Sequence, residues 1–188
     1  MYPEFISLTT DMANLTTVHG PEEYHSTFIA ILHPGDSDER RSYYHVKSST
    51  NYVLKIQIAC DFRHRIVHVS ECYKGSVHDI TILRESGLLE HVNDSVQIIA
   101  DKGYIGEDYV ITPRKKPRGR NLTSEDKDFN RDINSVRAAI ENIMRLKTHA
   151  LLGGIYRGAI DDFRKITKIA QVVSALCNMN LDKQPIRK

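Results

Sequence analysis

The chain of 188 residues lacks the long apolar runs, paired cysteines and basic leader that mark several classes of protein. No window approaches the ~18 uninterrupted apolar residues of a membrane-spanning helix, which excludes an integral membrane protein. Met1 leads into Tyr-Pro-Glu-Phe rather than into basic residues and an apolar run, which argues against a secretory signal. The three cysteines, Cys60, Cys72 and Cys177, form no CxxC pair. Neither a disulfide framework nor a thiolate zinc site is therefore expected, and a reducing compartment is favoured.

Positive charge is scarce at the start of the chain and abundant afterwards. Residues 1–40 hold seven acidic side chains and one basic side chain, whereas the remaining residues carry a net charge of +8. The overall charge of +2 therefore conceals a basic body, which suits a polyanionic partner such as nucleic acid. Apolar residues at 40% and charged residues at 27% indicate a folded domain rather than a disordered chain.

Short apolar runs predict strands, centred on residues 28–32, 53–59, 66–70, 96–100 and 109–112. The second and third strands are expected to form a hairpin, and residues 33–38 a loop. Helical spacing predicts three helices: one from Gly75-Ser76, with Ser76 as N-cap, to Leu89; one from about Asn130 to Leu152; and one from Asp161, its cap, to Asn178. Residues 121–126 also supply cap residues and early acids for a helix. This order indicates an α/β fold, a mixed sheet of about five strands flanked by helices.

Three carboxylates stand where a predicted element ends or exposes a face. Asp79 lies in the first turn of the 75–89 helix, Asp101 follows the 96–100 strand, and Glu141 lies mid-helix. Mg²⁺ prefers carboxylate oxygens, and two such ions can hold the attacking and leaving oxygens of a phosphodiester displacement. Each residue alone also fits a structural role, as a helix N-terminal charge, a turn residue and a surface ion-pair partner respectively.

Four motifs follow one another along the chain: GSVHD at 75–79, ADKGY at 100–104, TPRKKPRG at 112–119, and a helix pattern with Phe129-Asn130-Arg131, Val136-Arg137, Glu141 and Leu146-Lys147. In this order they closely resemble the nuclease domain of DDE transposases of the PIF/Harbinger and IS5-like kind. The resemblance covers about His25 to Leu181. It implies an RNase H-like fold, with a lead-in segment at 1–24, the nuclease domain at 25–181 and a basic tail at 182–188.

The resemblance also implies site residues and a cofactor. Asp101 and Glu141 would be the second and third catalytic carboxylates, and Asp79 an additional acidic residue of the site. All three would bind the metal, which would be Mg²⁺ or Mn²⁺. DNA would be the substrate, and cationic side chains would meet its phosphates: Lys115, Lys116, Arg118, Arg120, Arg145 and Lys147. The basic segment 114–120 also fits a nuclear localisation signal or a solvated loop.

The chain departs from the family at the first carboxylate. The family has Asp before Ala or Gly and then Thr, whereas this chain has His25-Ser26-Thr27. A neutral imidazole is a softer ligand for Mg²⁺ and brings no negative charge. Two functions therefore stay open: a metal-dependent DNA endonuclease degenerate at its first carboxylate, and a catalytically inactive, domesticated domain that binds DNA or a protein.

The resemblance extends to partners and location. Such transposases find their DNA ends with an upstream helix-turn-helix region, which this sequence does not show. Three expectations stay open: a gene fragment, a domesticated remnant, or one half of a two-protein system with a separate DNA-binding partner protein. A homodimer is a further expectation, and no association with a membrane is expected. The expected location is the nucleus in a eukaryote and the cytoplasm otherwise.

Overall fold

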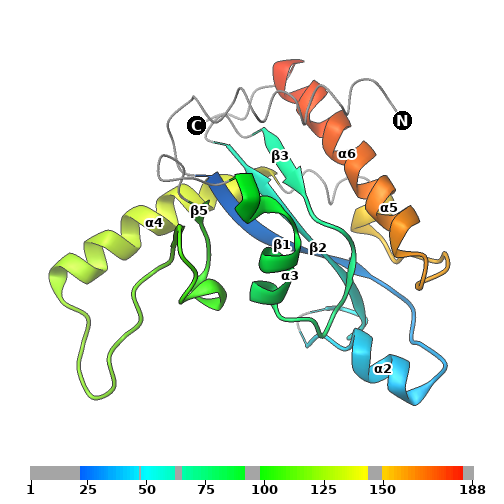
Figure 1. Ribbon diagram of the computed structural model, residues 1–188, viewed down its shortest axis with the longest axis horizontal. Coiled ribbons are helices and arrows are strands. Elements are labelled where there is room, and N and C mark those ends of the chain that lie inside the picture. Colours follow the sequence, from blue (N-terminus) through cyan, green and yellow to red (C-terminus); the bar gives the residue numbers. More distant parts are fainter. Residues whose placement is uncertain (1–21, 47, 62–64, 92–97, 144–149, 184–188) are drawn as a thin grey trace.

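The computed structural model describes residues 22–183 apart from residues 47, 62–64, 92–97 and 144–149. Within that range it does not describe the side chains of residues 22–25, 135–143, 150, 151, 182 and 183. The described residues form one sheet and the helices that cover it (Figure 1).

The sheet contains six strands among the described residues: β1 (Glu22–Ala30), β2 (Val53–Cys60), β3 (Ile66–Val69), β4 (Tyr73–Lys74), β5 (Ile98–Ile99) and β6 (Val110–Ile111). Their order is β3-β2-β1-β5-β6, with β4 pairing to β2 as well. The pairs β1–β2, β2–β3 and β2–β4 are antiparallel, whereas β1–β5 and β5–β6 are parallel. The mixed sheet and the β2–β3 hairpin predicted from the sequence are thus confirmed.

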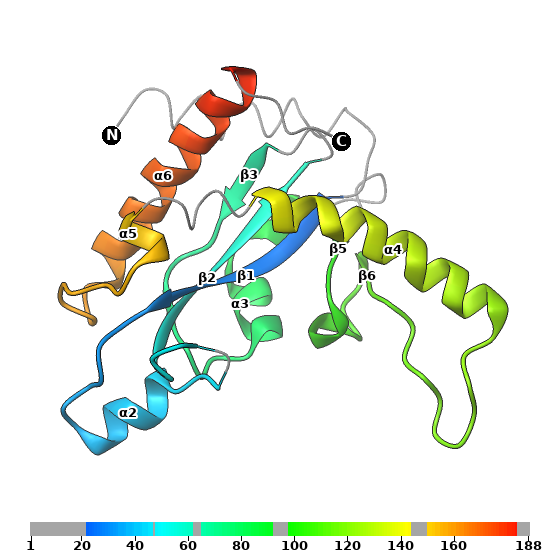
Figure 2. The same ribbon diagram turned by 180° about the vertical axis from the view of Figure 1, so that it is seen from behind.

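Five α-helices and two 3-10 turns occur in the described residues: α2 (Ser37–Tyr43), α3 (Asp79–Glu85), η1 (Leu88–His91), η2 (Lys102–Tyr104), α4 (Ser124–Ile143), α5 (Ala150–Gly153) and α6 (Phe163–Lys183). Figures 1 and 2 together show α3 on one face of the sheet and α4, α5 and α6 on the other. The molecule therefore has three layers, with the sheet in the middle.

Residue parity along β1 and β2 assigns each buried side chain to one of these faces. One core lies against α5 and α6 and includes Ile29, Ile56 and Ile58. The other lies against α3 and contains Ala59 with Leu83, Leu88, Ile98 and Tyr104. All eight residues of β2 are buried, because helices cover both of its faces.

The helix predicted from Ser76 to Leu89 is shorter than expected. It begins at Asp79 with His78 as its N-cap, and it ends at Glu85. Residues 75 and 76 are held by the sheet and α2 instead: the Gly75 amide donates to Val53 O, and the Ser76 amide to Ser42 O. A Cβ on Gly75 would lie 2.6 Å from Tyr43 O, so this close approach requires glycine. Ser76 therefore does not cap the helix.

Other boundaries also differ from those predicted. Residues 33–38 were expected to be loop, but Ser37 starts α2, capped by Asp36, which accepts from the Asp38 and Glu39 amides. α4 begins at Ser124, within the cap residues and early acids at 121–126, and Thr123 and Asp126 bond to each other's backbone amides in a reciprocal cap. At α6, Asp162 rather than Asp161 accepts from the Lys165 amide.

Candidate active site

Asp101 follows β5 directly, at the end of the strand where the sequence placed it. β1 and β5 are parallel, with Glu22 opposite Ile98 and Glu23 opposite Ile99. This pairing ends two residues before position 25 on β1 and two residues before Asp101 after β5. The first and second carboxylate positions of the sequence resemblance therefore follow the same parallel pair of strands, one on β1 and one after β5.

A tight turn orients the Asp101 side chain. Asp101 is the N-cap of η2, and its Oδ1 accepts the Gly103 amide at 2.7 Å. A Cβ on Gly103 would lie 2.8 Å from Asp101 Oδ1 and 3.9 Å from Asp79 Oδ2. The two carboxylates therefore border the same small space beside Gly103, and glycine keeps that space open.

Asp79 opens α3 and is held by a buried cation. Its Oδ1 lies 3.0 Å from Lys55 Nζ and accepts from Ser26 Oγ at 2.9 Å. Lys55 is only 4% exposed, and its Nζ also donates to Val77 O at 2.6 Å. A buried ammonium is stable only when it is paired in this way, so Lys55 and Asp79 act as a unit.

Gln57 joins this pair to the Asp101 turn. It is fully buried, and its Nε2 contacts Tyr104 Oη at 2.6 Å, Asp79 O at 2.9 Å and Ser26 Oγ at 3.1 Å. Sequence reasoning did not single out Ser26, Lys55, Gln57 or Tyr104 as site residues. The available signal was Lys55 and Gln57 on one parity of an otherwise apolar strand, because polar side chains at buried positions need specific partners.

Glu141 lies near the end of α4, which packs against β1. Figure 2 shows the last part of this helix crossing the sheet near β1 and β2. The side chains of His25 and Glu141 lie outside the described residues, and Arg145 and Lys147 lie outside them entirely. Of the three predicted carboxylates, the structure thus brings Asp79 and Asp101 together and locates Glu141 by its backbone alone.

The donor atoms suit a hard divalent cation. Asp79 and Asp101 supply carboxylate oxygens around Gly103, which is the ligand type that Mg²⁺ and Mn²⁺ prefer. Among the described side chains, no group of three His, Cys, Asp or Glu residues could hold a metal ion. Asp79 and Asp101 alone therefore do not make up a metal site.

The sequence profile of the DDE superfamily endonucleases matches residues 24–178. The chain belongs to this family. The chain is 37% identical over 89 residues to the "Probable transposase for insertion sequence element IS702" of Microchaete diplosiphon, which covers 45% of this chain and 32% of that protein. The match thus spans about a third of that relative. No solved structure matches the chain significantly.

DDE superfamily endonucleases normally use divalent metals and act on DNA. The carboxylates of Asp79 and Asp101 beside Gly103 are of the ligand type that such metals prefer. The assignment to the PIF/Harbinger subfamily stays a prediction. Within the described part of the chain, no helix is long and apolar enough to cross a membrane.

The basic segment of this endonuclease domain is an exposed loop between β6 and α4, projecting from the sheet in Figure 1. Arg114 anchors it, donating to Asp126 Oδ1 at 2.7 Å and lying 4.6 Å from the Phe129 ring. The Arg114 hydrogen bond holds the pKa of the Asp126 carboxyl below its usual value, with a smaller contribution from Thr123. The four predicted DNA-binding residues of the basic segment are all exposed: Lys115, Lys116, Arg118 and Arg120.

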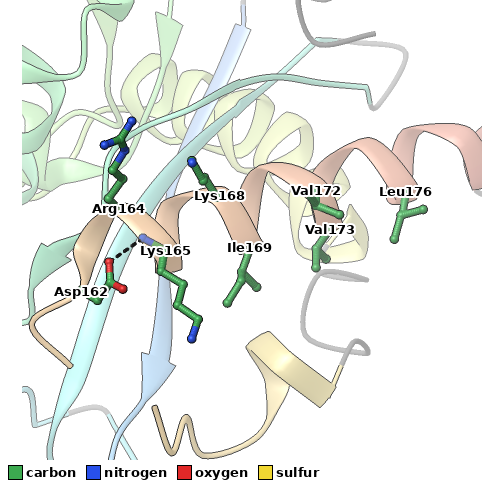
Figure 3. A pocket seen from close by; sticks show the side chains of 8 residues that line it. All are labelled: Asp162, Arg164, Lys165, Lys168, Ile169, Val172, Val173 and Leu176. Atoms are coloured by element: carbon green, nitrogen blue, oxygen red, sulfur yellow. Dashed lines mark hydrogen bonds between the residues drawn. The ribbon is translucent and has the colours of Figure 1, made fainter. Parts of the chain in front are cut away.

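A separate groove of about 690 Å³ runs along α6 (Figure 3). Its lining combines basic and apolar side chains: Asp162, Arg164, Lys165, Lys168, Ile169, Val172, Val173 and Leu176. It contains none of the predicted carboxylates, so the groove is not part of the candidate active site.

Proposed function

We propose that this DDE superfamily endonuclease domain has an RNase H-like fold and cleaves DNA phosphodiester bonds with Mg²⁺ or Mn²⁺, as part of a transposase. The resemblance requires carboxylate positions at a strand, at a strand end and on a late helix. Position 25 in β1, Asp101 after β5 and Glu141 in α4 match these requirements. The observation that carries the proposal is the parallel pairing of β1 with β5, because position 25 lies on the first strand and Asp101 directly follows the second.

In this proposal Asp101 and Glu141 hold the divalent cation, and the Asp79 carboxylate, paired with Lys55, lies beside them. A bound cation would stabilise the charge on the attacking and leaving oxygens. The chain's own groups prepare the site: the Gly103 amide orients Asp101, and Lys55 balances the charge of Asp79. The exposed cations of segment 114–120 bind the DNA backbone as point charges, together with Arg145 and Lys147.

His25 in place of an Asp removes one negative charge from the proposed cation site. Carboxylates attract Mg²⁺ through full charge, whereas a neutral imidazole offers only a dipole and a softer nitrogen. The proposal therefore includes weakened metal binding and slow cleavage by the wild-type domain.

The decisive measurement is nicking of supercoiled DNA with Mg²⁺ or Mn²⁺. We expect Asp101→Asn and Glu141→Gln each to lower the rate about 100-fold, because each removes a charge needed in the transition state. Glu125→Gln, an exposed residue in the first turn of the same helix, serves as the matched control and should cut like the wild type. Equal rates in all four proteins would refute the nuclease mechanism.

A second candidate function is an inactive domain that binds DNA. It is favoured by His25 and by the exposed basic segment, which needs no metal to bind phosphates. His25→Asp separates the two functions. If the remaining site is intact, its nicking rate should rise about tenfold, which corresponds to ~1.4 kcal/mol of barrier. Tight DNA binding without cleavage, in both the wild type and His25→Asp, would favour the inactive domain.

A further inference from the structure

A buried polar network crosses the domain beneath Asp101 and joins four elements. Ser26 comes from β1, Lys55 and Gln57 from β2, Asp79 from α3 and Tyr104 from η2. Ser26, Lys55, Gln57 and Tyr104 are all buried. A sheet core of this kind is normally apolar, so five polar side chains in mutual contact call for an explanation.

The contacts allow a directional arrangement of the hydrogen atoms. Gln57 Nε2 donates its two hydrogens to Asp79 O and Tyr104 Oη. The Tyr104 hydroxyl, 3.3 Å from Ser26 Oγ, can then donate to Ser26. Ser26 in turn donates to Asp79 Oδ1, which also receives Lys55. The network thus runs in one direction, from Gln57 to the Asp79 carboxylate, and depends on each member.

Tyr104 links this network to Asp101. The two residues close the same turn, in which the Tyr104 amide donates to Asp101 O at 3.2 Å and the Gly103 amide to Asp101 Oδ1 at 2.7 Å. The Tyr104 side chain is only 2% exposed, and its hydroxyl is bonded to Gln57 of β2. These contacts fix the position of the turn relative to the sheet. A shift of the Tyr104 side chain would therefore move the Asp101 carboxylate.

We propose that Gln57 and Tyr104 are positioning residues that set the direction of the Asp101 carboxylate, and that Asp79 with Lys55 anchors them. This inference rests on the proposed function in treating Asp101 as a metal-binding residue. Asp79 Oδ1 already accepts from two donors, so its contacts favour anchoring over metal binding by that oxygen. Residues that orient metal ligands commonly affect metal affinity without touching the metal.

The test compares Tyr104→Phe with Tyr43→Phe. Both tyrosines are 2% exposed, and Tyr43 donates a single hydrogen bond to Ile160 O at 3.3 Å, on the opposite face of the sheet. Each variant keeps its ring and loses one buried hydroxyl, so both should lower the urea midpoint, Tyr104→Phe by more because its hydroxyl contacts both Gln57 and Ser26. Tyr104→Phe alone should weaken Mn²⁺ binding, measured by calorimetry, about tenfold.

Hydrogen exchange of the Gly103 amide in the metal-free protein provides a readout that does not need metal binding. Tyr104→Phe should speed this exchange about tenfold relative to the wild type at matched stability, because the turn loses the hydrogen bond that holds it to Gln57. Tyr43→Phe should leave it unchanged. Equal Gly103 exchange in the two variants would overturn the positioning role. If the wild type binds no Mn²⁺, the proposed function fails, and Gly103 exchange alone then decides the positioning role.

Discussion

His68 is a single side chain whose burial couples folding to pH. It lies in β3 opposite Ala59, and no partner for its Nε2 is found among the described residues. Burial, with a smaller contribution from repulsion by His91, lowers the pKa of His68 from 6.5 to about 4. The unfolded chain therefore takes up a proton at this residue before the folded chain does as the pH falls.

From this shift we predict that the free energy of unfolding decreases as the pH falls from about 6.5 towards 4. The contribution of His68 to this loss should be on the order of 2 kcal/mol. Urea unfolding at several pH values measures it, and His68→Gln should flatten the profile over this range. His33→Gln, at an exposed position, is the control; an identical profile for His68→Gln and the wild type would contradict the prediction.

At the scale of elements, the β6–α4 connection is a loop with secured ends. Pro113 is buried at its start, and Arg114 bonds both to Asp126 and, through its backbone, to Asn130 of α4. The cations between these anchors point into solvent instead of forming ion pairs within the described residues. Such a loop presents charge to a polyanion at little conformational cost.

We predict that replacing Lys115, Lys116, Arg118 and Arg120 by Ala weakens DNA binding and its dependence on salt. If each cation meets one phosphate, the slope of log K against log salt should decrease by about 3 to 4. Fluorescence anisotropy over a salt series measures this. The matched control is the α6 triple variant Arg164→Ala, Lys165→Ala, Lys168→Ala, which removes exposed charge elsewhere. An equal loss of slope in both variants would argue for non-specific charge attraction.

At the scale of the whole molecule, the proposed cation site draws on separate parts of the chain. Position 25 belongs to β1, Asp101 follows β5, and Glu141 belongs to α4, which packs on β1. A ligand that contacts all three elements binds only the folded chain, because unfolding separates them. Metal binding should therefore stabilise the domain as a unit.

Mn²⁺ at ten times its dissociation constant should raise the melting temperature by roughly 3–6 °C for a chain of this size. Differential scanning calorimetry with and without Mn²⁺ measures the shift. Asp101→Asn should abolish it, whereas Asp108→Asn, an exposed carboxylate in the same region, should retain it. A shift that survives Asp101→Asn would place the cation elsewhere on the molecule.

The sequence alone determined the family, the mixed sheet and most strands. The alternating run at 53–59 records burial on two faces, and the order of GSVHD, ADKGY and the Glu141 helix pattern identifies a nuclease relative. Local signals of this kind suffice because strand and helix periods leave a trace in the residue order.

Only the tertiary structure decided where the α3 helix starts and what Asp79 contacts. Because β4 pairs with β2, α3 begins only at Asp79. The buried side chains of Lys55 and Gln57 form the polar network that includes Asp79 and Tyr104. The β1–β5 pairing, which sets Glu23 opposite Ile99, likewise joins residues far apart in the chain. Such contacts depend on which strands become neighbours. The periodicity of a segment predicts which of its residues are buried, but it does not predict which residues they contact.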